Sequence, residues 1–490
     1  MAVANGNGNK PNGNRITGPR CIALVGPFQS GKTTLLEAIL ARTGAIQRQG
    51  SVEAGNTVGD GSKEARDHRM SVELTVATTS FMDESFTFID CPGSVEFIHD
   101  MRAVLPAVDA AVVVCEADEK KVPQLQLILR ELEEQKIPHF LFINKIDKSD
   151  KRLRDTLQVL QPASRMPLLL RQIPIWKDGI VTGFVDLALE RAHVYKEYAP
   201  SQVIELSGDD LEREKTARFT MLETLADHDD ELMEQLLDDI PPPRDRIFDD
   251  LARELREGLV CPVLIGVATR TNGVLRLMKA LRHEAPNIET TATRLGVTGK
   301  DAIAYVLKTL NTAHGGKMSV ARVLTGQIGD GTTLSGTEGE VGRVSGVFKL
   351  MGQATEKRGA ASAGETVALG KLDHARTGDM LTAGKSAPAR PASVEPYPPV
   401  LAIAVQAKER KDDVKLGQAF LKLTDEDPSL RVDHNAENHE VVIWGQGEMH
   451  MRVATERLGD RFAVLDRGSV VYSCTKADVD EGELRRAISL

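Results

Sequence analysis

Cysteine is scarce in this sequence of 490 residues, and the cysteines that are present lie far apart. The five are Cys21, Cys91, Cys115, Cys261 and Cys474. An odd number without a C-x-x-C pair indicates neither a disulfide framework nor a zinc site, and the histidines form no cluster with the spacing of metal ligands. Cys21 and Cys115 fall in strand-like runs, so we interpret both as small core residues.

Long apolar runs are also missing from the sequence. None approaches the roughly 18 residues that are needed to cross a bilayer. The start, "MAVANGNGNKPNGNR", has no apolar segment of the signal-peptide type and is rich in glycine and asparagine. We therefore expect a disordered tail over residues 1–19, a cytoplasmic location and no membrane partner.

Basic residues are not in excess: 61 lysines and arginines face 71 aspartates and glutamates, for a net charge of −10. This balance argues against a nonspecific nucleic-acid coat and against a DNA partner, but it leaves open local phosphate contacts inside a large assembly. A hydrophobic content of 41% is ordinary for a soluble protein, and the length predicts about three domains.

The strongest motif that the sequence does contain is "CIALVGPFQSGKTTLLEAIL". An apolar strand runs into Gly26-x-x-x-x-Gly31-Lys32-Thr33, and an amphipathic helix follows, which is the context that a phosphate-binding loop requires. The glycines let backbone N–H groups face phosphates, Lys32 adds a charge toward the β- and γ-oxygens, and the Thr33 hydroxyl can bind Mg²⁺. A chance glycine turn is the alternative. The candidate nucleotide-binding residues here are Gly26, Pro27, Phe28, Gln29, Ser30, Gly31, Lys32, Thr33 and Thr34.

A second motif, "HFLFINKID", distinguishes guanine from adenine. The Asp147 carboxylate can accept hydrogen bonds from N1–H and the exocyclic N2–H₂ of guanine, and adenine offers no such pair of donors. A lone N-K-x-D is weak, but it follows a phosphate-binding loop here. The candidates are Asn144, which ties this loop to the phosphate loop, Lys145, Ile146 and Asp147. Gly266, Val267 and Ala268 are candidates for a last base-contacting loop that acts through backbone N–H on guanine O6.

The stretch "FTFIDCPGSVEF" completes the set. Asp90, at a strand end, can hold an Mg²⁺-bound water, and the Gly93 N–H can meet the γ-phosphate. Ser71 is either the hydroxyl that binds Mg²⁺ only with a γ-phosphate present or an ordinary polar residue at a strand start. The candidate metal residues are therefore Thr33, Ser71 and Asp90, and the candidate catalytic residues are Lys32, Gly93 and Ser94. Asp90, Cys91, Pro92, Gly93 and Ser94 are also candidate nucleotide-binding residues.

The rest of the chain changes character twice. Residues 297–385 show short alternating strands with glycine turns, and residues 386–398 form a Pro/Ala/Ser linker. Residues 399–468 follow a β–α–β–β–α order that suggests a small ferredoxin-like domain. We expect its first helix to present Val414, Gly417, Phe420 and Leu421 on one side, and its second helix to present Met451, Ala454, Leu458 and Phe462.

The order of these motifs is similar to that of the translational GTPases, and specifically resembles elongation factor G and its paralogues. The resemblance implies a multidomain α/β and β protein: a GTP-binding domain over 20–290 with an insertion at about 151–258, a β-barrel over 297–385, and the ferredoxin-like third domain. "EDPSLRV" and "GQGEMHM" resemble that third domain closely, and His450 has a structural or ribosome-facing role there. The resemblance further implies GTP or GDP and Mg²⁺ as cofactors, the ribosomal factor-binding site and its RNA as partners, action as a monomer, and a role in elongation or ribosome recycling.

The sequence departs from the family in three respects. Ser94 stands where the family has the histidine that orients the attacking water, and His99 and His68 are the candidates to replace it. Gln29 stands where the family's phosphate loop has an aspartate. The family continues into two further domains, whereas here resemblance fades after about Gly468 and 469–490 read as a divergent tail.

These departures leave two hypotheses: a GTPase of translation, or a slow or non-hydrolytic GTP-dependent regulator that binds the ribosome. The barrel and the third domain disfavour an unrelated metabolic GTPase.

Overall fold

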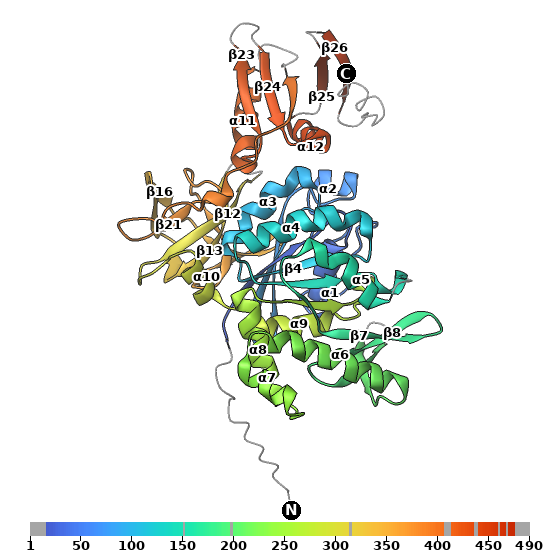
Figure 1. Cartoon of the computed structure of the whole chain (residues 1–490). Coiled ribbons are helices and arrows are strands. Elements are labelled where there is room, and N and C mark those ends of the chain that lie inside the picture. The colour runs from blue at the N-terminus through green and yellow to red at the C-terminus, as the bar shows by residue number, and fades with distance from the viewer. Residues whose placement is uncertain are drawn as a thin grey trace, which may run out of the picture.

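The computed structural model of the chain describes residues 16–149, 152–196, 199–312, 316–405, 413–435, 440–458, 461–466 and 469–475. Most of the expected disordered tail (residues 1–15) and residues 476–490 of the expected divergent tail lie outside this part of the chain. No helix among the described residues is both long and apolar enough to span a bilayer. Figure 1 shows the α/β domain that is expected to bind GTP, here called the GTP-binding domain, at the centre, with the barrel beside it and the third domain above.

The GTP-binding domain is built on a sheet with the strand order β2-β3-β1-β4-β5-β11-β6, in which β2 is antiparallel to β3 and the other pairs are parallel. The strands are β1 (Arg20–Val25), β2 (Thr75–Phe81), β3 (Glu84–Asp90), β4 (Ala110–Cys115), β5 (His139–Ile143), β6 (Leu168–Leu170) and β11 (Cys261–Ile265). Every residue of β1, β4, β5 and β11 is buried, as expected for parallel strands covered on both faces.

Helices cover both faces of this sheet. The helices of this domain outside the insertion are α1 (Lys32–Arg42), α2 (Lys63–His68), α3 (Ile98–Val104), α4 (Val122–Glu134), α5 (Leu153–Leu160), α9 (Val274–Glu284) and α10 (Ile288–Arg294). α1 and α9 pack on one face, and α3, α4 and α5 on the other. The side chains predicted for the apolar face of α1, Leu35, Leu36, Ile39 and Leu40, are all fully buried. The apolar pattern therefore predicted the buried face of α1 correctly.

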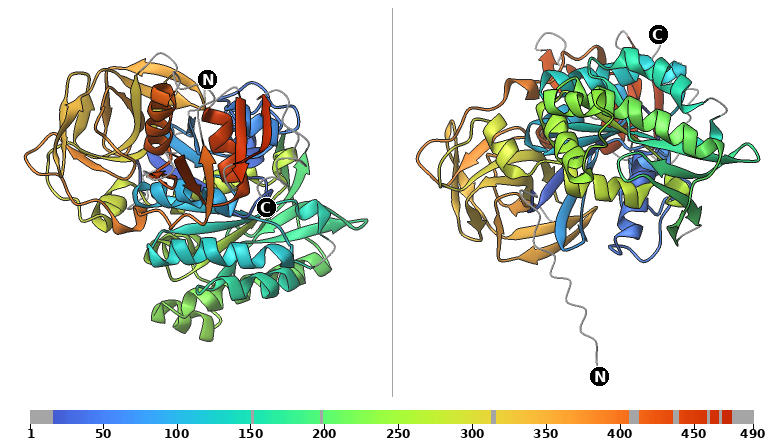
Figure 2. Two further views of the ribbon diagram at one scale, coloured as in Figure 1. Left: turned by 90° about the horizontal axis from the view of Figure 1, so that it is seen from above. Right: turned by 60° about the horizontal axis from the view of Figure 1, so that its bottom comes forward.

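The inserted segment forms its own sheet and helices. β7 (Gln172–Lys177), β8 (Ile180–Asp186), β9 (Arg191–Lys196) and β10 (Ala199–Ile204) form an antiparallel sheet in the order β10-β9-β8-β7. α6 (Asp209–Ala226), α7 (Asp230–Leu237) and α8 (Arg244–Glu257) share a core with it (Figure 2). α5 and β6 fall within the range expected for the insertion, but β6 pairs in parallel with β11 and extends the main sheet.

The β-barrel follows α10. Its strands are β12 (Ile303–Asn311), β13 (Lys317–Thr325), β14 (Gln327–Gly329), β15 (Thr333–Gly336), β16 (Gly339–Arg343), β17 (Val347–Met351), β18 (Ala354–Arg358), β19 (Ala360–Ser362), β20 (Thr366–Gly370) and β21 (Met380–Thr382). β17 pairs with β2 through Met351 and Ala77, so the barrel and the main sheet are continuous in hydrogen bonding.

A buried ion pair fastens the barrel to the GTP-binding domain. Arg322 of β13 and Asp109, before β4, are 0% exposed, and their charged atoms lie 2.5 Å apart. Arg322 also donates to the Ala107 carbonyl at 2.7 Å, and the Tyr305 hydroxyl donates to the Ala103 carbonyl at 2.6 Å. Because buried charges are costly unless they are paired and hydrogen-bonded, this junction tolerates little change.

The third domain has the expected β–α–β–β–α order. It contains β22 (Leu401–Val405), α11 (Asp413–Glu426), β23 (Arg431–Asn435), β24 (Glu440–Gly445) and α12 (Glu448–Leu458), and β25 (Arg461–Asp466) pairs with β26 (Ser469–Thr475). β22, β24 and β23 form one antiparallel sheet. The class predicted from the sequence, a multidomain α/β and β protein, is confirmed.

The helix faces predicted for the third domain are partly wrong. Val414 and Leu421 of α11 are 71% and 72% exposed, and the buried side is formed by Phe420 and Leu423. Leu421 follows the buried Phe420 in sequence but lies on the exposed side of the helix. Met451 and Ala454 of α12 are buried as expected, but Phe462 lies in β25, because α12 ends at Leu458.

The substitution Arg322→Met tests the junction between the barrel and the GTP-binding domain. It leaves the Asp109 carboxylate buried without its cation, so we expect a loss of about 3–5 kcal/mol in unfolding free energy. Urea unfolding followed by circular dichroism measures this loss.

Arg358→Met is the matched control, since Arg358 pairs with Glu365 at 2.6 Å in the same barrel but is 39% exposed. We expect it to cost less than about 1 kcal/mol. Adding Asp109→Leu to Arg322→Met removes the unpaired charge and restores part of the stability. Equal losses for Arg322→Met and Arg358→Met would contradict the role of the buried pair.

Candidate functional site

The phosphate-binding loop joins β1 to α1 and takes the strained backbone that its glycines allow. Gly26 and Gly31 have φ values of 146° and 93°, and Gln29 has φ 59°. A Cβ atom at Gly26 would overlap the Val114 carbonyl oxygen, and one at Gly31 would lie 2.5 Å from Nδ2 of Asn144. Gly26 is therefore required by the close approach of β4 and Gly31 by that of Asn144, and φ favours glycine at both positions.

Lys32 is the buried cation of this loop. Its ammonium group donates to the carbonyl oxygens of Gly26 at 3.0 Å and Pro27 at 3.2 Å, and the residue is 5% exposed. Burial lowers the pKa of Lys32 to about 8, against the attraction of Asp90. A phosphate or other anion bound at the loop would add negative charge next to the desolvated Lys32 ammonium group.

The three residues predicted to bind a metal lie together. The Thr33 hydroxyl donates to Oδ2 of Asp90 at 2.7 Å and lies 3.1 Å from the Ser71 hydroxyl. The Ser71 hydroxyl donates to Oδ1 of Asp60 at 2.9 Å. Asp60 was not predicted from the sequence: it stands in no motif, and only the folding of the loop between α1 and α2 brings it here.

The two carboxylates in this cluster have unused oxygens. Oδ1 of Asp90 and Oδ2 of Asp60 are buried without a hydrogen-bond partner. Burial raises the pKa of Asp90 to about 7 against the opposing charge of Lys32, and burial also raises the pKa of Asp60. Buried, uncompensated carboxylate oxygens beside two hydroxyl groups fit a hard divalent cation such as Mg²⁺. The described residues contain no group of three or more His, Cys, Asp or Glu side chains that would hold a metal by themselves.

The base-reading loop is held against the phosphate loop by Asn144. Its Nδ2 donates to the Ser30 carbonyl at 2.9 Å, and its Oδ1 accepts from the Ala268 N–H at 3.0 Å. Lys145 donates to the Gln29 carbonyl at 2.8 Å. Ile146 is buried, and Oδ1 of Asp147 is a buried acceptor without a hydrogen-bond partner.

The second loop predicted to contact the base follows β11. A Cβ atom at Gly266 would lie 2.5 Å from the Asn272 carbonyl oxygen. The Val267 N–H donates to the Asn272 carbonyl oxygen, and the Ala268 N–H donates to Oδ1 of Asn144. A contact between the Ala268 N–H and guanine O6 would therefore require Ala268 to share this N–H. Gln49, another residue that the sequence did not single out, donates to the Ala268 carbonyl at 3.1 Å.

Ser94 begins the short turn η1 (Val95–Phe97) that follows the D-x-P-G loop. Its hydroxyl oxygen accepts the Glu96 N–H at 3.4 Å. The neighbouring Gly93 packs against the phosphate loop, since a Cβ atom at Gly93 would be 3.0 Å from the Pro27 carbonyl oxygen. The D-x-P-G loop therefore covers the end of the site where a terminal phosphate is expected.

Neither histidine that could replace the family histidine is placed at this loop. Burial lowers the pKa of His99, which is 4% exposed, and the charged groups nearest to it include Asp427, Asp100 and Lys308. His68 bonds Glu456 of the third domain at 2.9 Å. The neighbours of His99 and His68 are therefore residues outside the phosphate loop.

Two segments near the expected position of the terminal phosphate contact α12: the turn η1 through Glu96, and α2 through His68. Oε2 of Glu96 accepts the His450 N–H at 2.7 Å, and the Phe97 and His450 rings lie 5.4 Å apart. His450 is 2% exposed and bonds Asp427 at 2.8 Å. This burial and bonding favour the structural one of the two roles predicted for His450.

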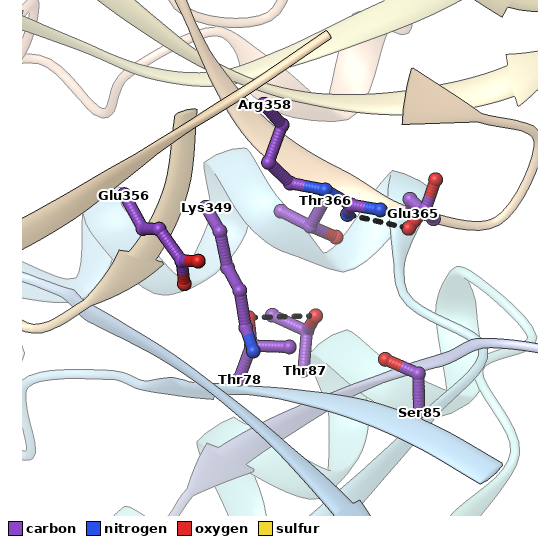
Figure 3. Close-up of a pocket in the computed structure, with 8 residues that line it drawn as sticks. All are labelled: Thr78, Ser85, Thr87, Lys349, Glu356, Arg358, Glu365 and Thr366. Carbon is purple, nitrogen blue, oxygen red and sulfur yellow. Dashed lines mark hydrogen bonds and ion pairs between the residues drawn. The ribbon is translucent and has the colours of Figure 1, made fainter. Parts of the chain in front are cut away.

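A separate cavity of about 350 Å³ lies between β2–β3 and the barrel. Figure 3 shows its lining, which is formed by Thr78, Ser85, Thr87, Lys349, Glu356, Arg358, Glu365 and Thr366. It contains none of the predicted site residues, so the nucleotide site described above is distinct from it.

Comparison with known proteins places the chain in a family. The model of the elongation factor Tu GTP binding domain matches residues 18–287, more than half of the chain, and that of elongation factor G domain III matches residues 397–465. An elongation factor G-like protein of Synechocystis sp. is 40% identical over 442 residues, which are 90% of this chain. The chain belongs to the elongation factor G family of translational GTPases.

Two further relatives agree with this assignment. Elongation factor G 2 of Syntrophus aciditrophicus is 28% identical over 504 residues, which cover 98% of this chain and 74% of the relative. A crystal structure of a Thermus thermophilus protein has a TM-score of 0.80 and 29% identity, and covers 90% of this chain. The chain spans 65% of the Synechocystis protein and 66% of the Thermus chain.

Asp147→Asn tests the base-reading assignment. An amide presents a donor to N2–H₂ of guanine, whereas xanthine has a carbonyl there, so the preference is expected to move from GDP to XDP. We expect GDP affinity to fall by roughly one to two orders of magnitude. Calorimetry with GDP and XDP measures both affinities.

Asp155→Asn, at an exposed position in the first turn of α5, is the control and should leave both affinities unchanged. If Asp147→Asn binds GDP as tightly as the unmodified protein, Asp147 does not read the base.

Proposed function

We propose that this chain is a GTP-binding translation factor that binds Mg²⁺-GTP and hydrolyses it at the ribosome, in elongation or in ribosome recycling. Its proposed partners are the ribosomal factor-binding site and the RNA there, reached by a monomer in the cytoplasm. Membership in the elongation factor G family supports this proposal.

The observation that carries the proposal is the arrangement around the phosphate loop. Lys32 is a buried cation held against the phosphate loop, the unpartnered oxygens of Asp60 and Asp90 belong to the cluster around Thr33 and Ser71, and the unpartnered Asp147 oxygen belongs to the base loop. These groups match in order the triphosphate, the metal and the purine of one ligand. A magnesium-bound guanine nucleotide uses all three.

The metal site follows from the same atoms. Thr33 and Ser71 would bind Mg²⁺ through their hydroxyl groups, with Asp90 and Asp60 holding its water ligands. Bound Mg²⁺ supplies charge neutralisation on the β- and γ-phosphates. Ser71, in the segment after α2, is the hydroxyl that would bind Mg²⁺ only when a γ-phosphate is present.

A slow or non-hydrolytic regulator is the second candidate, and the position of Ser94 favours it. A serine hydroxyl can orient water but cannot carry positive charge or act as a base near neutral pH. Here its oxygen already accepts the Glu96 N–H, and both His99 and His68 lie in other surroundings. Phosphoryl transfer depends on positioning and charge stabilisation, so the step most affected is the stimulated rate.

Phosphate release from labelled GTP, with and without ribosomes, separates the two candidates. We expect hydrolysis that rises on adding ribosomes, and Ser94→His to raise the stimulated rate by about tenfold or more by restoring an ionisable group at the water. GTP binding should be unchanged, since Ser94 makes no contact with the base loop or with Lys32 among the described hydrogen bonds.

Ser207→His, at an exposed position in the insertion, controls for adding an imidazole anywhere on the surface. GTP binding without turnover, in the presence of ribosomes, would favour the regulator. A protein that binds neither GTP nor GDP would refute both candidates.

A further inference from the structure

Gln124 stands in the first turn of α4 and touches two loops of the site at once. Its Oε1 accepts the Phe28 N–H of the phosphate loop at 3.2 Å, and its Nε2 donates to the Gly93 carbonyl of the D-x-P-G loop in a short hydrogen bond. No sequence motif singled it out, and the proposed function assigns it no part.

The two bonds define the orientation of the side-chain amide. A backbone N–H needs an oxygen acceptor and a carbonyl needs an N–H donor, so the reverse orientation would lose both bonds. Both functions of the amide are therefore used, and a side chain with only one of them cannot make the same bridge.

The platform that carries Gln124 is rigid. The next residue of α4, Leu125, is 1% exposed in the core, and Ile128 and Leu129 pack on the same side. A side chain on such a helix turn is better placed to hold two loops in register than one carried on a loop.

One bridged peptide lies next to the peptide that is proposed to meet the terminal phosphate: the Gly93 N–H belongs to the Pro92–Gly93 bond, and Gln124 holds the carbonyl on the other side of Gly93. Gly93 approaches the phosphate loop so closely that a Cβ atom would lie 3.1 Å from Cα of Phe28, and its carbonyl belongs to the peptide bond that leads into Ser94. Holding this carbonyl fixes the plane of the Gly93–Ser94 peptide, and with it the position of Ser94.

We propose that Gln124 is a positioning residue: its amide holds the phosphate-binding loop to the D-x-P-G loop and sets the position from which Gly93 meets the γ-phosphate and Ser94 meets the attacking water. The inference rests on the proposed GTP-binding function and deepens it. It assigns to Gln124 a part in distinguishing GTP from GDP, because only GTP has the phosphate that lies between the two loops.

Gln124→Met keeps the length of the side chain and removes both hydrogen bonds. We expect its affinity for a non-hydrolysable GTP analogue to fall roughly tenfold, the loss that two neutral hydrogen bonds can produce. GDP affinity and the melting temperature should stay near those of the unmodified protein. Gln124→Glu keeps the acceptor but places a carboxylate against the Gly93 carbonyl, so we expect a larger loss for the GTP analogue. Calorimetry with both nucleotides measures these affinities.

Gln126→Met and Gln126→Glu are matched controls, since Gln126 is exposed on the same helix turn. Support for the inference is a selective loss for the GTP analogue in both Gln124 variants and in neither Gln126 variant. Equal losses for GDP and the GTP analogue, or values equal to those of the controls, would overturn it. If the unmodified protein binds neither nucleotide, the proposed function fails first, and that result is distinct from either outcome at Gln124.

Discussion

The register between β1 and β3 is the constraint on which the candidate site depends. Leu24 pairs with Asp90 across the parallel ladder, and the Cys91 N–H donates to the Leu24 carbonyl at 3.0 Å. β1 leads into the phosphate loop and β3 into the D-x-P-G loop, so this pairing brings Asp90 within 2.7 Å of Thr33. A shift of one residue would turn Asp90 away from the phosphate loop. The full burial of β1, with apolar side chains on both faces, holds the register in place.

The segments that flank the phosphate end also form the surface on which the third domain rests. Glu96 reaches the His450 N–H, His68 reaches Glu456, and Arg457 pairs with Glu73 at 2.7 Å. Between these polar contacts lies a small apolar cluster of Ala65, Val72, Phe97 and Val453. Ser71 precedes Val72 of this cluster, and Ser94 lies two residues before Glu96. A rearrangement of either segment would therefore change the surface that α12 contacts. Segments that border the nucleotide site are therefore also the segments that contact the third domain.

Much of the site could be predicted because its motifs are contiguous in sequence. Gly26 to Thr33 and Asn144 to Asp147 each fold as one loop at a strand end, so residue order alone sets their geometry. Asp60, Gln124 and Gln49 could not be predicted, because each acts through a contact that depends on the path of a long loop or on a helix from elsewhere in the sheet. The misassigned face of α11 has a related cause: Val414 and Leu421 fit an apolar pattern, but which stripe is buried depends on the partner sheet.

Ser94 shows how binding and hydrolysis depend on different parts of this site. The contacts proposed for the nucleotide come mainly from Lys32, Thr33, Asp90 and Asp147, whereas Ser94 is the candidate for orienting the attacking water. The Ser94 oxygen starts the turn η1, whose Glu96 side chain reaches α12. A serine therefore serves the link to the third domain, and its remaining O–H can orient one water at most. If the chain binds GTP as proposed, one set of residues therefore holds the nucleotide, while the rate of hydrolysis depends on another part of the site, at Ser94.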